Sequence, residues 1–205
     1  MTSLFDKPVY SIILYPNDNF FYNLNLFFKE NNIDKKELDI PLNFHHQVKA
    51  SFYLSDVYTE EKMIESFKNI NSNDLQYLFN QKFIFNSVKK INENLFIIFN
   101  EDRKFNFLKN QTMRNFDLYR KTLDANEIKK DLLRFRDLSE KEFFYYQIWG
   151  YPYYFEYDFH GIPITIFKED MDLKDHFNTL QYSSLKLLKK QTIYNSNYDE
   201  IVSLE

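Results

Sequence analysis

The order of strand-like and helix-like segments partly repeats along the chain, and this repeat restricts the fold more than any other feature of the sequence. Each half carries a strand-like stretch that contains histidine, followed by a helical segment and by two strand-like runs typical of a hairpin. The predicted segments are a strand at 9–15, a helix at 20–30, a histidine strand at 43–54, a helix at 60–69, a hairpin at 82–100, a charge-laced helical region from 102 to about 147, a histidine strand within 149–167, a short helix at 172–180 and a hairpin at 183–205. The sequence therefore predicts an α+β fold in which residues 1–205 form one domain of two related lobes.

Composition excludes several classes of function. The net charge of -4 argues against a protein that coats duplex DNA or single strands by neutralising phosphates, whereas a small nucleotide or one end of an RNA needs only a few positive groups. The chain has no cysteine, which excludes a thiol nucleophile and a cysteine zinc site, and its two glycines exclude a Gly-rich phosphate loop. With no signal-peptide pattern and no run of 18 apolar residues, the sequence predicts a cytoplasmic protein that does not enter the membrane.

The first histidine strand, "NFHHQVKASFYL" (43–54), has one apolar and one polar face when its residues alternate. Two of the four histidines of the chain are adjacent here. The predicted apolar face consists of Phe44, His46, Val48, Ala50 and Phe52, and the predicted polar face of His45, Gln47, Lys49, Ser51 and Tyr53. An imidazole, an amide and an ammonium group on one face could grip a phosphate. An ordinary half-exposed strand explains the same pattern, and in either case His46 is expected to be a buried or edge histidine.

The second histidine strand lies in "WGYPYYFEYDFHGIPITIF" (149–167). Regular alternation places His160 on the same face as Ile162, which is the environment of a core histidine. Pro163 cannot donate to a sheet ladder, so an edge position or a bulge is expected there. A one-residue bulge would bring Thr165 to the face of His160, and the sequence leaves both registers open.

These two stretches resemble the motifs of the two-histidine (2H, LigT-like) phosphoesterase superfamily, in which each lobe contributes an H-x-[T/S] motif. The closer resemblance is to the branch linked to phosphonate metabolism, which has approximately YGFHATLKPPF at the first motif and WGYPYV…FRFHMTLTG at the second. The matching text here is "LNFHHQVKASF" and "WGYPYYFEYDFHGIPITIF", and "VYSIILYP" is similar to the opening strand of that branch. The resemblance runs from Val9 to at least Phe167, the closing hairpin is compatible with it, and "WGYPY" before Phe-His is its most specific part.

The resemblance implies two antiparallel sheets that face a central cleft, with helices on the outside, and metal-independent hydrolysis of a cyclic or 2′-linked phosphodiester of a nucleotide or short RNA. His45 and His160 would be the general acid and base, in an order that stays open, and no metal or cofactor is expected. Gln47 and Lys49 would bind phosphate oxygens, and Thr165 could join them through the bulge. The chain departs from the family where Gln47 and Ile162 replace the motif threonines and Asp158 replaces an arginine. A degenerate member that only binds a nucleotide or a protein is the alternative.

Other polar and aromatic residues have weaker claims to function. Tyr10 and Tyr53 could stack on a nucleobase, although core packing explains them equally well. The Lys and Arg residues between 100 and 136 are balanced by acids and are expected on solvated helix faces. The sequence leaves the oligomeric state open.

Overall fold

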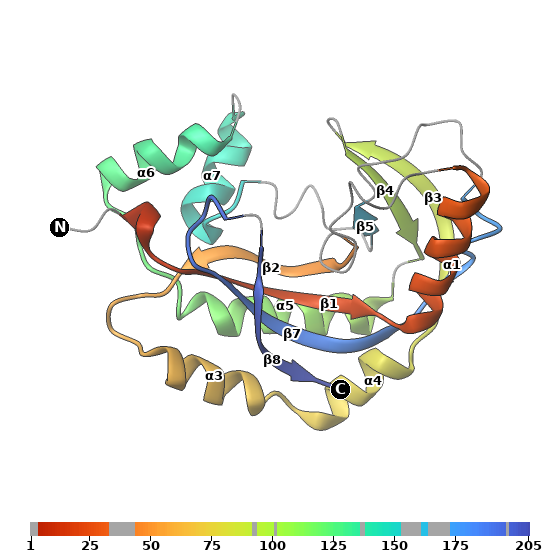
Figure 1. The fold of residues 1–205 in the computed structure, drawn as a ribbon. Helices are drawn as coiled ribbons and strands as arrows, with labels where there is room; N and C mark the ends of the chain where they lie inside the picture. The colour runs from red at the N-terminus through yellow and green to blue at the C-terminus, as the bar shows by residue number, and fades with distance from the viewer. Residues whose placement is uncertain are drawn as a thin grey trace.

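The computed structural model describes residues 4–32, 44–91, 94–100, 102–135, 138–152, 161–163, 173–195 and 197–205. These residues form two four-stranded antiparallel sheets with helices packed around them (Figure 1). The strands are β1 (Val9–Pro16), β2 (His46–Tyr53), β3 (Phe83–Ile91), β4 (Asn94–Phe99), β5 (Gly161–Pro163), β6 (Thr179–Leu180), β7 (Tyr182–Lys190) and β8 (Asp199–Leu204). The first sheet has the order β2-β1-β7-β8 and the second the order β5-β4-β3-β6. The predicted α+β class with two antiparallel sheets is confirmed.

The helices begin where the sequence supplies capping side chains. They are η1 (Leu4–Asp6), α1 (Asp18–Glu30), α3 (Glu60–Lys68), α4 (Ser72–Asn80), α5 (Arg103–Asp117), α6 (Ala125–Asp131), η3 (Leu132–Arg134) and α7 (Glu140–Trp149). Thr59 caps α3 as predicted, and Ser139 and Glu142 form the predicted capping box of α7. No helix in the described part of the chain is long and apolar enough to cross a membrane.

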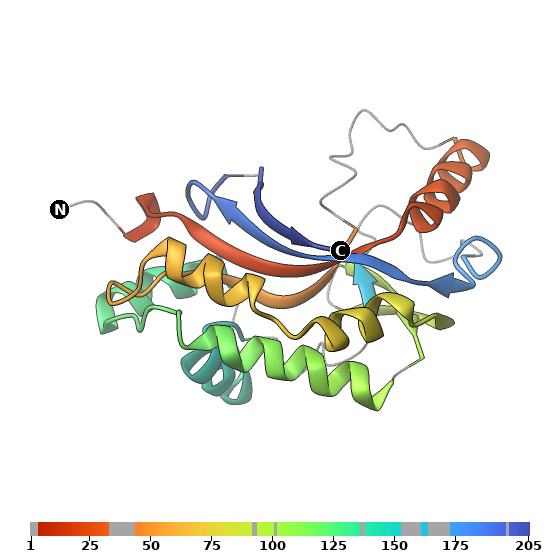
Figure 2. The same ribbon diagram turned by 90° about the horizontal axis from the view of Figure 1, so that it is seen from below.

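Three helices cover one face of the first sheet. α3 contacts β8, α4 contacts β7 and α5 contacts β2, so the helix layer follows the strand order (Figure 2). Strand β1 lies inside this sheet and is buried along almost its whole length, which explains its β-branched and aromatic composition. α6 and α7 lie near the end of the first sheet at which β1 begins, and α1 lies beside the second sheet (Figure 1).

Each sheet combines strands from both halves of the sequence. The late hairpin β7–β8 joins β1 and β2, whereas the early hairpin β3–β4 joins β5, which follows the second histidine. Both hairpins were predicted, and both pair in antiparallel fashion. The repeat in the sequence therefore corresponds to two sheets, but the hairpins are exchanged between them.

Two predictions about segments need correction, and one helix was not predicted. The helix predicted at 172–180 is wrong in its described part, since Leu173–Asn178 form turns and Thr179–Leu180 form the short strand β6. Trp149 ends helix α7 instead of opening a strand, because Gly150 adopts a left-handed conformation (φ 73°) that terminates the helix. Helix α4 was missed, although Leu75 and Leu78 form its buried side and Asn71 caps its start.

Candidate functional site

Strand β2 pairs with β1 irregularly, and this irregularity decides which side chains can reach a site. From Tyr10 to Ile13, β1 advances three residues, while β2 advances five between their partners Phe52 and Gln47. β2 accommodates the two extra residues as bulges, and the bulges turn the side chains between them to the other face of the sheet. As a result Lys49 pairs with Ile12 and lies on the helix-covered face together with His46 and Phe52.

The opposite face of β2 carries Gln47, whose side chain is exposed. Strand alternation extends this face to His45, the half-buried residue that precedes β2. Ser51 lies on the same face and its hydroxyl is 2.9 Å from that of Ser11 on β1. The predicted polar face is therefore present without its lysine.

His46 is a buried core histidine, as predicted. It is only 3% exposed, and its ring packs against Phe105 of α5 and Tyr182 of β7. Nδ1 of His46 lies 3.1 Å from the carbonyl oxygen of Gly161, and because that oxygen only accepts, Nδ1 carries the hydrogen of this bond. The contact joins the first sheet to β5 of the second sheet.

This hydrogen bond connects the two histidine segments of the sequence. His46 follows His45, and Gly161 follows His160, so each partner is the chain neighbour of a candidate catalytic histidine. Ile162, at the position of the second motif threonine, pairs with Ile97 and is fully buried. His160 and Thr165 lie outside the described residues.

The prediction that Lys49 shares a face with His45 and Gln47 is wrong. The Lys49 side chain is 3% exposed, its Nζ lies 2.7 Å from Oδ1 of Asp117 at the end of α5, and it also lies 5.2 Å from the centroid of the Phe52 ring. Regular alternation would have forbidden this burial, but the bulges turn the lysine towards a carboxylate that compensates its charge. Burial lowers the pKa of Lys49, an effect that the charge of Asp117 opposes but does not cancel. Lys49 is therefore withdrawn as a phosphate ligand.

Asp117 also binds Arg120, which was not predicted as a functional residue. Nε of Arg120 donates to Oδ1 of Asp117 over 2.8 Å, and one terminal nitrogen, Nη2, donates to the carbonyl oxygen of Ile148 over 2.6 Å. Burial alone would raise the pKa of Asp117, but the hydrogen bond from Arg120 and the charge of Lys49 hold it below its ordinary value. The prediction that the Lys and Arg residues of 100–136 lie on solvated helix faces is wrong for Arg120, whose side chain is 17% exposed, and for the buried Lys109. The sequence signal for this ion pair was the three-residue spacing of Asp117 and Arg120, which places two side chains on the same side of a helix.

The two candidate stacking tyrosines are structural. Tyr10 is buried on the helix-covered face, packs against Phe52 and donates a hydrogen bond to Glu60 of α3. Burial, reinforced by that carboxylate, raises the pKa of Tyr10. Tyr53 packs edge-on against Phe5 in a small cluster at the end of the sheet. Neither ring is exposed enough to stack on a base, so core packing explains both.

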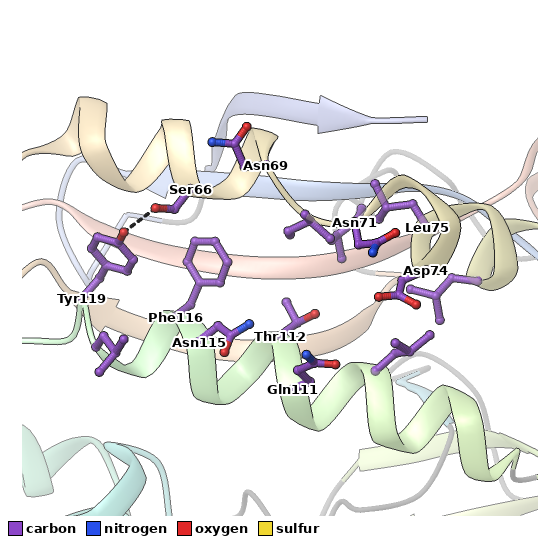
Figure 3. A pocket seen from close by; sticks show the side chains of 15 residues that line it. Ser66, Asn69, Asn71, Asp74, Leu75, Gln111, Thr112, Asn115, Phe116 and Tyr119 are labelled. Carbon is purple, nitrogen blue, oxygen red and sulfur yellow. Dashed lines mark hydrogen bonds between the residues drawn. The ribbon is translucent and has the colours of Figure 1, made fainter.

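A cavity of about 450 Å³ lies elsewhere, between α5 and the α3–α4 pair (Figure 3). Its apolar lining residues include Phe116 and Leu185. Polar side chains such as Asp74 and Gln111 also line it (Figure 3). Among the described residues that line it, none is a lysine, arginine or histidine. Such a lining offers a phosphate no positive charge, and the Asp74 carboxylate would repel it, so this cavity is a poor candidate for a phosphodiester site.

Comparison with known proteins gives one family match. A family model described as "Protein of unknown function (DUF1045)" matches residues 47–190, which include the first-motif residue Gln47 and the whole second motif. The match begins two residues after His45. No curated protein matches the chain.

Proposed function

The chain belongs to the DUF1045 family, and we propose that it is a phosphodiesterase of the two-histidine type. Its substrate class is a cyclic or 2′-linked phosphodiester of a nucleotide or short RNA. One observation carries the proposal: the residues next to His45 and His160 share the 3.1 Å hydrogen bond between Nδ1 of His46 and the Gly161 oxygen. The two motifs that carry the resemblance to the two-histidine superfamily thus contribute residues, His46 and Gly161, that contact each other.

The proposed reaction needs only two imidazoles and a bound phosphate. One histidine takes a proton from water as the water oxygen bonds to phosphorus, and the other gives a proton to the ribose oxygen as its bond to phosphorus breaks. Gln47, exposed on the face that extends to His45, would donate its amide N–H to a non-bridging oxygen. Lys49 has no part in this scheme because Asp117 holds it on the opposite face.

The test is a turnover assay on 2′,3′-cyclic nucleotides, cyclic dinucleotides and 2′-5′ oligoadenylates, with and without EDTA. We expect hydrolysis of at least one compound that EDTA does not affect, and its loss in His45→Ala and in His160→Ala. His176→Ala is the matched control, since His176 lies in a turn beside Glu30 and Phe27. Activity that EDTA abolishes and a divalent ion restores would remove the two-histidine mechanism.

A second candidate function, a binding module without turnover, is favoured by two specific observations. Ile162 is buried against Ile97 and Lys49 is paired with Asp117, so neither offers a contact to phosphate. This candidate predicts that compounds of the panel raise the melting temperature without being converted, and that single His→Ala changes leave this shift intact. Ile162→Thr would place a hydroxyl in the core, so it tests stability more than rate.

A further inference from the structure

The end of helix α5 contacts both the strand of the first histidine and the segment that leads to the second. Asp117 accepts from Lys49 on β2 and from Arg120, and Arg120 donates to the carbonyl oxygen of Ile148 near the end of α7. The chain of contacts therefore runs from β2 through two side chains to the start of "WGYPY". We infer that Asp117 and Arg120 are positioning residues that fix strand β2 relative to this segment.

The contact from Asp117 to Lys49 of β2 is buried and specific. The Nζ–Oδ1 distance of 2.7 Å is that of a charge-assisted hydrogen bond, and the Lys49 side chain is almost inaccessible. The bulges of β2 are what bring Lys49 to this face. A distortion of the strand is thus coupled to one ion pair, which explains why a lysine occupies a core position.

Arg120 contacts the end of α7 through both its guanidinium group and the aliphatic part of its side chain. Its Nη2 binds the Ile148 oxygen, and its side chain packs on Gly150, where an added Cβ would lie 2.8 Å from Cδ of Arg120. Gly150 also needs its positive φ to end α7. The glycine of "WGYPY" therefore serves the helix end and the arginine contact together.

Backbone contacts place this cluster firmly against β2. Residues that follow α5 run beside the end of the strand: Arg120 forms a β-bridge with Leu54, and the amide of Lys121 donates to the Tyr53 oxygen over 2.8 Å. The backbone of Arg120 is thus held by the end of β2, and the side chain of Arg120 holds the end of α7.

The test uses Trp149, the only tryptophan of the chain, which lies between Ile148 and Gly150. Acrylamide quenching of its fluorescence reports on the α7 end without any assay of activity. The variant is Lys49→Met with Asp117→Leu, which removes both charges of the buried pair and leaves only Arg120, whose side chain is partly exposed, without its carboxylate. We expect the melting temperature to stay near wild type while the quenching constant rises.

The matched control carries the same substitutions at an exposed ion pair, Lys7→Met with Asp56→Leu, and should leave quenching unchanged. Arg120→Lys is the second variant, because lysine keeps the charge but cannot bind Asp117 and Ile148 at once. It should raise quenching as well. If both variants quench like wild type, the inference is overturned.

The effect on rate rests on the proposed function. If the wild type turns over a compound of the panel, both variants should lose about 100-fold, the scale on which a remote misplacement acts. Turnover at the wild-type level together with raised quenching would overturn the positioning role in catalysis. If the wild type converts no compound, the proposed function fails, and the quenching result alone decides whether the cluster fixes β2 against α7.

Discussion

Two positions of strand β2, two residues apart, have opposite surroundings. Gln47 is exposed and opposes Ile13 of β1, whereas Lys49 is buried, opposes Ile12 and binds Asp117 of α5. An ideal strand would place both side chains on the same face. The difference shows that the bulges turn Lys49 to the helix-covered face and leave the side chain of Gln47 exposed on the opposite face.

Under the proposed function, the two faces of β2 have different roles. His46 and Lys49 on the helix-covered face have protein partners, with a carbonyl oxygen for the imidazole and a carboxylate for the ammonium group. The other face carries Gln47 and extends to His45. Substitutions on one face should therefore change the free energy of unfolding, and substitutions on the other should change binding and rate.

The largest expected effect belongs to the exposed face. His45→Ala should reduce turnover of any compound that the wild type hydrolyses by about 10²- to 10⁴-fold, since it removes a proton-transfer group. Its free energy of unfolding should change by less than about 1 kcal/mol, because the residue lies outside the core clusters. Steady-state kinetics and urea unfolding measure the two quantities. A folded His45→Ala protein with wild-type turnover would show that this face is not catalytic.

On the helix-covered face, Asp117→Asn should have the largest effect on stability. It keeps the size of the side chain but leaves Lys49 buried without a counter-charge, at a cost of about 3–5 kcal/mol. The half-exposed pair Lys186 and Glu200, whose atoms also lie 2.7 Å apart, provides the comparison. Glu200→Gln should cost less than about 1 kcal/mol. Equal losses in urea unfolding would mean that burial of Lys49 has no energetic consequence.

His46→Ala should have an intermediate effect. Removing the ring takes away the hydrogen bond to Gly161 and the packing on Phe105, so the free energy of unfolding should fall by about 1–3 kcal/mol. His46→Gln keeps a donor for the same oxygen and should recover part of the loss. If His46→Ala abolished turnover in a fully folded protein while His45→Ala did not, the assignment of the two faces would be reversed.

Much of the fold followed from local patterns because those patterns were strong. The run at 9–15, the Asn92–Glu93 separation of two apolar runs and the capping box at Ser139 each specify one local structure, and each element is present. Periodicity also placed His46 in the core. What the patterns could not give was the exchange of hairpins between sheets, since strand pairing depends on contacts distant in sequence.

The site was less predictable because each bulge shifts the alternation of β2 by one residue, so the two bulges reverse the face of Lys49 and restore the faces of the residues on either side. The alternation of 44–53 assigned Gln47, Ser51 and His46 to the correct faces, and failed for Lys49, where β2 takes up extra residues. Nothing in "HQVKAS" marks that irregularity. It is stabilised by Asp117, 68 positions away, and a carboxylate so distant in sequence cannot be recognised as a partner before the fold is known.

The smallest expected effect, a difference in acid sensitivity, tests the same ion pair by pH. The pKa of Asp117 is lowered in the folded protein, so the folded state binds fewer protons than the unfolded state in the acid range. The stabilisation from its charge is therefore complete above the unfolded pKa of about 4 and is lost as the pH falls through the folded value. The advantage of wild type over Asp117→Asn in urea unfolding should be constant near neutral pH and shrink below about pH 4. Because Glu60, whose pKa is also lowered, is the same in both proteins, its titration cancels in this difference. An advantage that stays constant through the acid range would mean that the Asp117 charge does not stabilise the fold, and that Lys49 is held on the helix face by packing alone.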